Sequence, residues 1–345
     1  MFGEHLDYLH LPVISCAISL RLTIDAHYSF DQVTTIRTPD IGRVIKIEKL
    51  SPLRYEDQRD YFRSGLKVLR EKGFTFSRGI DCTIHGEIPI AAGTSSSSAM
   101  VVSWINLLAR MSDQEIVLTP EECATYAYAA EVLEFSEPGG KMDQNATAFG
   151  GILFQNFYPA DSVEPLHPKL GSFVLGDSGI PKDTKTILST VKNRVLSIVE
   201  KLSSRYPVFS LHTMTLDDLP QFLNDLEVEE QNLLRATVRN FEICKDAHRL
   251  LKDSRTDEHL FGTLLTEHQA LLRDVLLISR PKIDRMLDAA MGAGAYGGKI
   301  NGSGGGGCMF VYAPKNTEQV AEAITKAGGK AYIVHVDEGT RVILS

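Results

Sequence analysis

The segment that most constrains this chain is a run of small residues between a predicted strand and an apolar helix. Residues 88–99 read IPIAAGTSSSSA, and residues 99–111, AMVVSWINLLARM, predict a helix that is buried on nearly all sides. Small side chains let backbone N–H groups approach an anion, and a helix N-terminus adds unpaired donors. The pattern predicts a loop that cradles a triphosphate, or else the serine-rich start of an ordinary buried helix. It is not a Walker A loop, because the sequence contains no GxxxxGK[ST].

A second candidate motif joins a glycine turn to a base and an acid. Residues 137–144 read EPGGKMDQ, so Lys141 and Asp143 follow a turn that ends at Gly140, where the chain can pass close to a ligand. A carboxylate at a junction between loop and helix can accept a hydroxyl proton or orient a nucleophile toward a phosphate. The alternative is a surface turn in which Asp143 caps a helix. Glu131, on the preceding predicted helix, is either a metal ligand or a solvent-exposed side chain.

Two further motifs lie near the ends of the chain. Residues 302–307, GSGGGG, contain a formal GxGxxG but precede a predicted strand at 308–313, whereas a dinucleotide-binding turn opens a helix. We therefore reject a dinucleotide site and expect backbone that approaches a ligand closely, or a plain glycine loop. Residues 3–8, GEHLDY, carry several hydrogen-bonding side chains that suit recognition of a polyol, or form a polar tail.

Composition restricts the function classes. A net charge of −8 over 345 residues argues against a nucleic-acid partner, which requires clustered Lys and Arg. The five cysteines are scattered without a CxxC pair and predict reduced thiols in a cytoplasmic protein. Neither a signal peptide nor an apolar run of about 18 residues is present, so we expect no membrane partner.

The order of predicted elements favours an α+β fold with two lobes, because strands and helices alternate without a steady βαβ rhythm. One or two strands are predicted within 11–26, and single strands at 82–90, 152–157, 172–176, 308–313, 331–336 and 340–344. Helices are predicted at 55–72, 99–111, 119–135, 142–150, 183–204, 228–252, 257–278, 282–292 and 316–327.

Taken together, the motifs resemble those of the GHMP kinases, a family named for galactokinase and for homoserine, mevalonate and phosphomevalonate kinases. GEHLDY at 3–8 resembles the galactokinase sugar-binding signature, and residues 88–99 resemble the family's phosphate-binding motif. INGSGGGGC at 300–308 resembles its C-terminal glycine motif. Residues 130–144 also fit the galactokinase pattern AE…PxGxMDQ without a gap. The four matches follow the family order across almost the whole chain.

The resemblance implies a two-lobe GHMP kinase fold with the active site in the cleft between the lobes. The N-terminal lobe would span 1–165 and the C-terminal lobe 166–345. Family members normally carry a strand before the first motif, with an arginine or lysine near the reacting phosphate. We therefore expect the N-terminal edge strand to be missing, and Lys141 is one candidate for the positive charge.

Roles for single residues also follow from the resemblance. Asp143 corresponds to the catalytic aspartate, while Ser97 and Glu131 correspond to Mg²⁺ ligands, with Ser98 a near rival of Ser97. The implied sugar-binding residues are Glu4, His5, Asp7, Tyr8 and Gly140. The implied ATP-binding residues are Gly93, Thr94, Ser95, Ser96, Ser97, Ser98, Gly304 and Gly305.

The resemblance implies ATP-dependent phosphorylation of a small-molecule sugar, with Mg²⁺. Galactose is the default because GEHxDY and MDQ are galactokinase-like; another aldose or a heptose phosphate is the next alternative. Mevalonate and homoserine fit less well, because kinases for those substrates lack GEHxDY. A catalytically weak sensor of sugar and ATP is the alternative from another class. The sequence does not determine the oligomeric state.

Overall fold

The computed structural model describes residues 1–48, 53–90, 92–137, 139–181, 184–253 and 255–344. The described chain forms two compact units, neither of which is continuous in sequence. The first unit comprises Met1–Cys16, Ala91–Thr94 and Gly151–Val336, and the second comprises Ala17–Ile90, Ser95–Gly150 and Asp337–Ser345. The predicted lobe boundary at 165–166 lies inside the first unit, and the division into two linear lobes stays a prediction.

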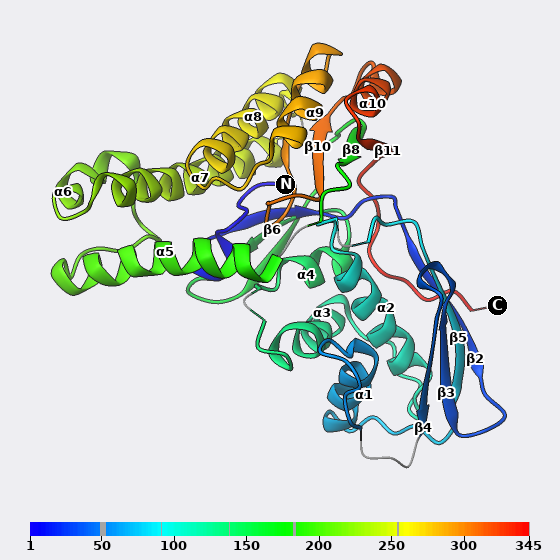
Figure 1. Ribbon diagram of the computed structural model, residues 1–345. Coiled ribbons are helices and arrows are strands. Elements are labelled where there is room, and N and C mark those ends of the chain that lie inside the picture. The colour runs from blue at the N-terminus through cyan, green and yellow to red at the C-terminus, as the bar shows by residue number, and fades with distance from the viewer. Residues whose placement is uncertain (49–52, 91, 138, 182–183, 254, 345) are drawn as a thin grey trace. The chain divides into compact units, whose positions relative to one another are not determined.

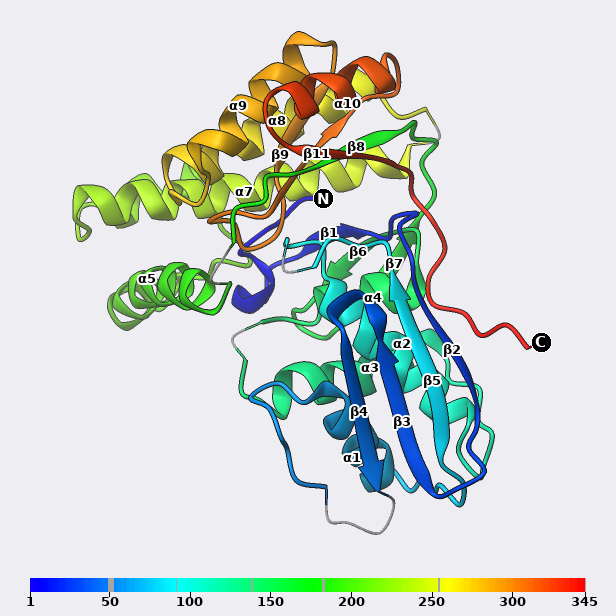
Figure 2. The same cartoon turned by 45° about the vertical axis from the view of Figure 1, so that its right-hand side comes forward.

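The second unit is one sheet with helices on one face (Figure 2). In spatial order its strands are β2 (Leu22–Tyr28), β5 (Ile80–Gly86), β3 (Val33–Thr38) and β4 (Arg43–Glu48). Its helices are α1 (Tyr61–Glu71), α2 (Ser96–Arg110), α3 (Pro120–Tyr128) and α4 (Met142–Phe149). Only the β3–β5 pair within this sheet is parallel. The mixture of helix and sheet confirms the predicted α+β class.

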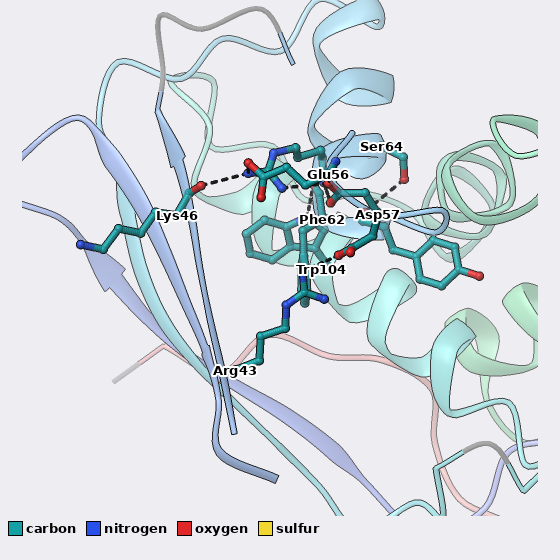
Figure 3. A network of polar contacts seen from close by, with 10 residues as sticks. Arg43, Lys46, Glu56, Asp57, Phe62, Ser64 and Trp104 are labelled. Carbon is teal, nitrogen blue, oxygen red and sulfur yellow. Dashed lines mark hydrogen bonds and ion pairs between the residues drawn. The ribbon is translucent and has the colours of Figure 1, made fainter. Parts of the chain in front are cut away.

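Helix α2 forms the core of this unit, as its apolar sequence predicts. Val101, Trp104 and Ile105 are fully buried. Trp104 Nε1 donates a hydrogen bond to Phe62 O at 3.0 Å, which ties α2 to α1 without leaving the indole N–H unpaired. The two rings meet edge to face (Figure 3).

A buried arginine joins α1 to the edge strand β4. Arg63 donates to Asp60 at 2.8 Å, to Glu56 at 2.6 Å and to Lys46 O at 3.1 Å. Figure 3 labels Lys46 and Glu56 in this network. Asp60 also caps α1, because its side chain accepts a hydrogen bond from Arg63 N. The network satisfies a guanidinium whose side chain is only 6% exposed.

The first unit contains two sheets and six helices among its described residues. The larger sheet is antiparallel, in the order β11 (Lys330–Val334), β8 (Phe173–Asp177), β10 (Cys308–Tyr312) and β9 (Gly297–Ile300). The smaller is β1 (Val13–Cys16), β6 (Ile152–Asn156) and β7 (Ser162–Leu166). The helices are α5 (Thr184–Arg205), α6 (Pro220–Leu223), α7 (Val228–Lys252), α8 (Glu258–Asp274), α9 (Pro281–Gly292) and α10 (Thr317–Lys326).

Helices cover both faces of the larger sheet (Figure 1). On one face, Phe173 of β8 packs edge-on against Phe261 of α8. On the other face, a Cβ placed at Gly176 would lie 2.9 Å from both Met286 of α9 and Ile324 of α10. Because successive residues of a strand point to opposite faces, the sheet is the middle layer of three.

Most predicted elements match the structure, with a few differences. The predicted strand at 340–344 is wrong: among the described residues that segment joins no sheet, and Ile343 is 76% exposed. Its apolar run, residues 342–344, pairs with no described strand. The hairpin β3–β4 was not predicted, because seven of its twelve residues are polar and interrupt the apolar pattern; four of these seven are exposed. The helix predicted at 119–135 is α3 followed by a π-helical turn, η3 (Ala129–Leu133).

Candidate active site

Three of the predicted site segments converge within the second unit. Ser97 and Ser98 occupy the first turn of α2, Glu131 lies on the π-helical turn η3, and Asp143 lies in the first turn of α4. Both serine hydroxyls hydrogen-bond to the Glu131 carboxylate. The structure therefore brings both candidate serines to the same carboxylate. A π-turn re-aims one side chain of a helix, which is a frequent feature of functional sites.

The carboxylate of Glu131 is poised to attract a cation. Burial raises its pKa, partly offset by hydrogen bonds from Ser97, Gln144 and Ser98, and the charge of Asp143 raises it further. Gln144 Nε2 donates to Glu131 Oε2 at 2.6 Å, while Gln144 Oε1 is buried without a hydrogen-bond partner in the described chain. A hard divalent cation would neutralise this cluster and use its oxygens, so the residues fit Mg²⁺.

A dedicated protein cage for a metal is not part of the described structure. No group of three or more His, Cys, Asp or Glu side chains able to hold a metal occurs among the described residues. Mg²⁺ bound with a nucleotide needs only one or two carboxylates, because phosphates and water supply the remaining ligands. The predicted Mg²⁺ ligands Ser97 and Glu131 therefore stay a prediction that suits this chemistry.

The N-terminus of α2 retains the features predicted for anion binding. Its N-cap, Ser95, has a positive φ of 56° and makes no side-chain cap hydrogen bond. The first N–H groups of a helix have no intrahelical partner, and here they belong to Ser96, Ser97 and Ser98. Phosphate binding at this point stays a prediction, as does the contribution of Thr94, which is half-buried in the preceding turn.

The turn before α2 is fixed to the glycine loop inside the first unit. Asn301 Nδ2 donates to Gly93 O, and Cys308 N donates to Ala92 O, both at 2.6 Å. A Cβ at Gly307, whose φ is +71°, would lie 2.2 Å from Ala92 O. The neighbouring Ala91 lies outside the described residues. Two motifs more than 200 residues apart are thus one local structure.

The glycine loop owes its composition to space and backbone angle. Gly304 and Gly305 have φ values of +81° and +77°, and a Cβ on either would overlap an isoleucine side chain, Ile278 or Ile187 respectively. Gly305 N donates to Ile278 O at 2.6 Å, and Gly305 O accepts from Arg280 Nε. The N–H of Gly305 is therefore already hydrogen-bonded within the protein. Contact of Gly304 and Gly305 with ATP stays a prediction.

The N-terminal motif divides into an inward and an outward part. Glu4 is buried and ion-paired with Lys299, and His5 is buried between Tyr8 OH at 2.8 Å and Ser303 O at 3.1 Å. Asp7, at the start of the 3₁₀ turn η1 (Asp7–Leu9), remains half-buried. Direct sugar contact by any of these residues stays a prediction.

The remaining predicted residue, Gly140, lies in the segment before α4. Arg59 forms a bidentate pair with Glu137 at 3.0 Å, which fixes the start of this segment. Pro138, the next residue of the motif, lies outside the described residues. Sequence reasoning assigned no role to Gln144 or Lys299, although Gln144 belongs to the MDQ motif. No strand was predicted at β9, and Lys299 lies in a glycine-rich stretch that gave no sequence signal for its burial.

Comparison with known proteins agrees with this architecture. The descriptions "GHMP kinases N terminal domain" and "GHMP kinases C terminal" match residues 60–151 and 247–331. A mevalonate kinase of Thermococcus onnurineus is 28% identical over 99% of this chain and 95% of its own length. A galactokinase of Clostridium perfringens is 26% identical over 96% of this chain and 87% of its own.

The fold itself is that of a solved structure. The crystal structure of Lactococcus lactis galactokinase complexed with galactose superposes with a TM-score of 0.85, covering 98% of this chain and 91% of that chain at 20% identity. No described helix is both long and apolar enough to cross a membrane. The chain belongs to the GHMP kinase family and is an ATP-dependent phosphotransferase that acts on a hydroxyl group.

Proposed function

We propose that this chain transfers the γ-phosphoryl group of ATP to a hydroxyl group of a sugar, with galactose as the first candidate. The observation that carries the proposal is the position of Asp143, half-buried at the start of α4 and electrostatically coupled to Glu131. Asp143, a carboxylate beside the buried, serine-bonded carboxylate of Glu131, suits transfer of a phosphoryl group from an anionic nucleotide to an alcohol.

Each residue of this cluster has a defined task in the proposed reaction. Asp143 orients the attacking hydroxyl and accepts its proton. The N-terminus of α2 binds the phosphates through its backbone N–H groups. Ser97 and Glu131 would hold Mg²⁺, which supplies charge neutralisation on the triphosphate. Most of the rate acceleration then comes from positioning and electrostatics, as in other phosphoryl transfers.

Sugar specificity rests on the N-terminal motif. His5, Asp7 and Tyr8 bring an imidazole, a carboxylate and a phenol into one short segment, and His5 and Tyr8 are hydrogen-bonded to each other. A hydroxyl-rich substrate requires several convergent polar groups to fix its orientation. Asp7, at the half-buried end of this segment, is the residue we assign to direct contact with sugar hydroxyls.

Mevalonate is the second candidate substrate. It is supported by the similarity to the Thermococcus onnurineus mevalonate kinase, which extends over 99% of this chain. The same Asp143 cluster would serve either acceptor, because both reactions phosphorylate an alcohol.

A coupled assay of ADP release distinguishes the candidates. Purified chain, ATP and Mg²⁺ are combined with galactose, other aldoses, heptose phosphates or mevalonate, and kcat/KM is compared. We expect a sugar to give the highest value; a mevalonate value above every sugar would overturn the sugar assignment. Binding of a sugar with no ADP release from any acceptor would indicate a sensor and contradict the proposal.

Substitution of the assigned aspartate tests the mechanism. Asp143→Asn should lower kcat by at least about 10²-fold, the usual loss for a positioned acid or base. Asp57→Asn, which breaks only an exposed pair with Arg43, is the matched control and should remain near wild type. Turnover of Asp143→Asn close to that of the control would refute the assignment.

A further inference from the structure

The strongest unexplained feature of the first unit is an ion pair with both partners buried. Lys299, on β9, is 0% exposed, and its Nζ pairs with Glu4 Oε1 and donates to Ile300 O at 2.9 Å. Glu4 is 4% exposed. Burying two charges costs desolvation free energy, and the attraction between the charges offsets that cost only when the geometry is good. Such a pair therefore contributes little net stability by itself.

The surroundings hold Glu4 in the ionised form. Burial alone would raise its pKa, but chiefly Lys299 and the Met1 ammonium group lower the pKa to about 2. His268 Nδ1 lies 3.8 Å from Glu4 Oε2, yet burial lowers the pKa of His268 to about 3, so this ring is neutral near pH 7. Lys299 is thus the side chain that supplies the countercharge.

The pair joins two motifs at a specific point. Glu4 precedes His5, whose Nε2 is 3.1 Å from Ser303 O, and Lys299 lies four residues before Ser303 at the entrance to the glycine loop. Asn240 Nδ2 of α7 fixes the same segment by donating to Glu4 O at 2.9 Å. The ion pair and the His5 contact therefore set the register between the GEHLDY segment and the glycine loop.

We propose that Lys299 is a positioning residue for acceptor binding, and that Glu4 acts through it rather than by touching the acceptor. This inference rests on the proposed function, because it assigns the 3–8 segment to acceptor recognition. With its carboxylate turned into the interior, Glu4 aligns His5 and Asp7 with the glycine loop. Loss of the pair should thus loosen the acceptor site more than the catalytic cluster around Asp143.

A double-substitution cycle separates positioning from simple stabilisation. Lys299→Met leaves Glu4 as an uncompensated buried charge and should lower the thermal midpoint, whereas Glu4→Gln with Lys299→Met removes both charges and should recover it. We expect the acceptor KM to rise at least about tenfold in both variants, with kcat and the KM for ATP within about threefold of wild type. Recovery of the acceptor KM together with stability in the double variant would overturn the proposal.

The control pair is Lys326→Met with Glu322→Gln, an exposed ion pair of the same unit, which should change neither quantity. Hydrogen exchange gives a second readout that needs no acceptor. In the double variant, amides of residues 3–11 and 302–307 should exchange at least about tenfold faster while those of α2 are unchanged. Unchanged exchange in both segments would refute the positioning role, whether or not any tested acceptor is phosphorylated. Failure to phosphorylate any acceptor would by itself count only against the proposed function.

Discussion

Substitution of a single glycine, Gly307→Ala, tests whether the glycine loop and the turn before α2 form one structural unit. The φ of Gly307 is +71°, and its Cβ would stand 2.2 Å from Ala92 O and 2.7 Å from Ala92 C. Real Cβ atoms essentially never lie within 3.0 Å of another non-bonded heavy atom, so the turn that contains Ala92 must shift. Ala92 O also accepts from Cys308 N, and Gly307 O accepts from Ser178 N and Oγ.

The expected loss has two parts. A left-handed alanine costs about 1–2 kcal/mol relative to glycine. Displacing Ala92 weakens the hydrogen bond from Cys308 and the neighbouring bond from Asn301 to Gly93 O, each contributing about 0.5–1.5 kcal/mol. The sum is about 2–5 kcal/mol off the free energy of unfolding. Since Gly93 leads into the serine segment, we also expect the KM for ATP to rise.

The matched control is Gly328→Ala. Gly328 has a φ of +92° in the same unit, but its Cβ would meet only the flexible end of the Lys282 side chain, with Cε at 3.5 Å and Nζ at 3.9 Å. This variant should therefore lose only the conformational part, about 1–2 kcal/mol, and keep the wild-type KM for ATP. Urea denaturation and steady-state kinetics measure both quantities. Equal destabilisation of the two variants, with the KM for ATP unchanged in each, would show that contact with Ala92 has no energetic role.

Three other expectations concern buried groups. Burial raises the pKa of Glu131 in the folded state above its ordinary value of 4.5. The protonated side chain of Glu131 therefore stabilises the fold below pH 4.5, and this stabilisation is lost as the pH rises through the folded-state pKa. Without Mg²⁺, Glu131→Gln should therefore gain stability relative to wild type in urea titrations as the pH rises; a pH-independent difference would contradict this. Arg63→Met should lower the free energy of unfolding by about 3–5 kcal/mol, because Asp60 stays buried without its ion-pair partner. Arg43→Met, which removes only an exposed pair, should lower it by about 0–1 kcal/mol, and equal urea midpoints would contradict this difference. Burial raises the pKa of Cys82 and Cys123 to about 12, so mass spectrometry should find both modified by Ellman's reagent at pH 8 only after unfolding, and rapid native labelling would argue against their burial.

Most of the local elements, and the order of the motifs, are predictable from the sequence. The continuous apolar run after Ala99 predicted the buried helix α2, and Thr119, Pro120 and Glu122 predicted the capped start of α3. These signals are local: they depend on side-chain periodicity and on capping groups a few residues apart. The glycine content of 302–307 predicted close approach of the backbone to a ligand, which stays a prediction; what the structure shows is a close approach of Gly307 to the backbone of Ala92.

Which polar groups face each other depends on contacts between segments that are remote in sequence. Glu4 carries the same carboxylate as Asp7, yet Glu4 is ion-paired with Lys299 almost 300 residues away while Asp7 remains half-buried. The contact of Gln144 with Glu131 depends on a π-turn that a helical pattern does not reveal. Burial and ion pairing are properties of the folded chain, because the dielectric surroundings and partner of a charged side chain are set by segments remote in sequence.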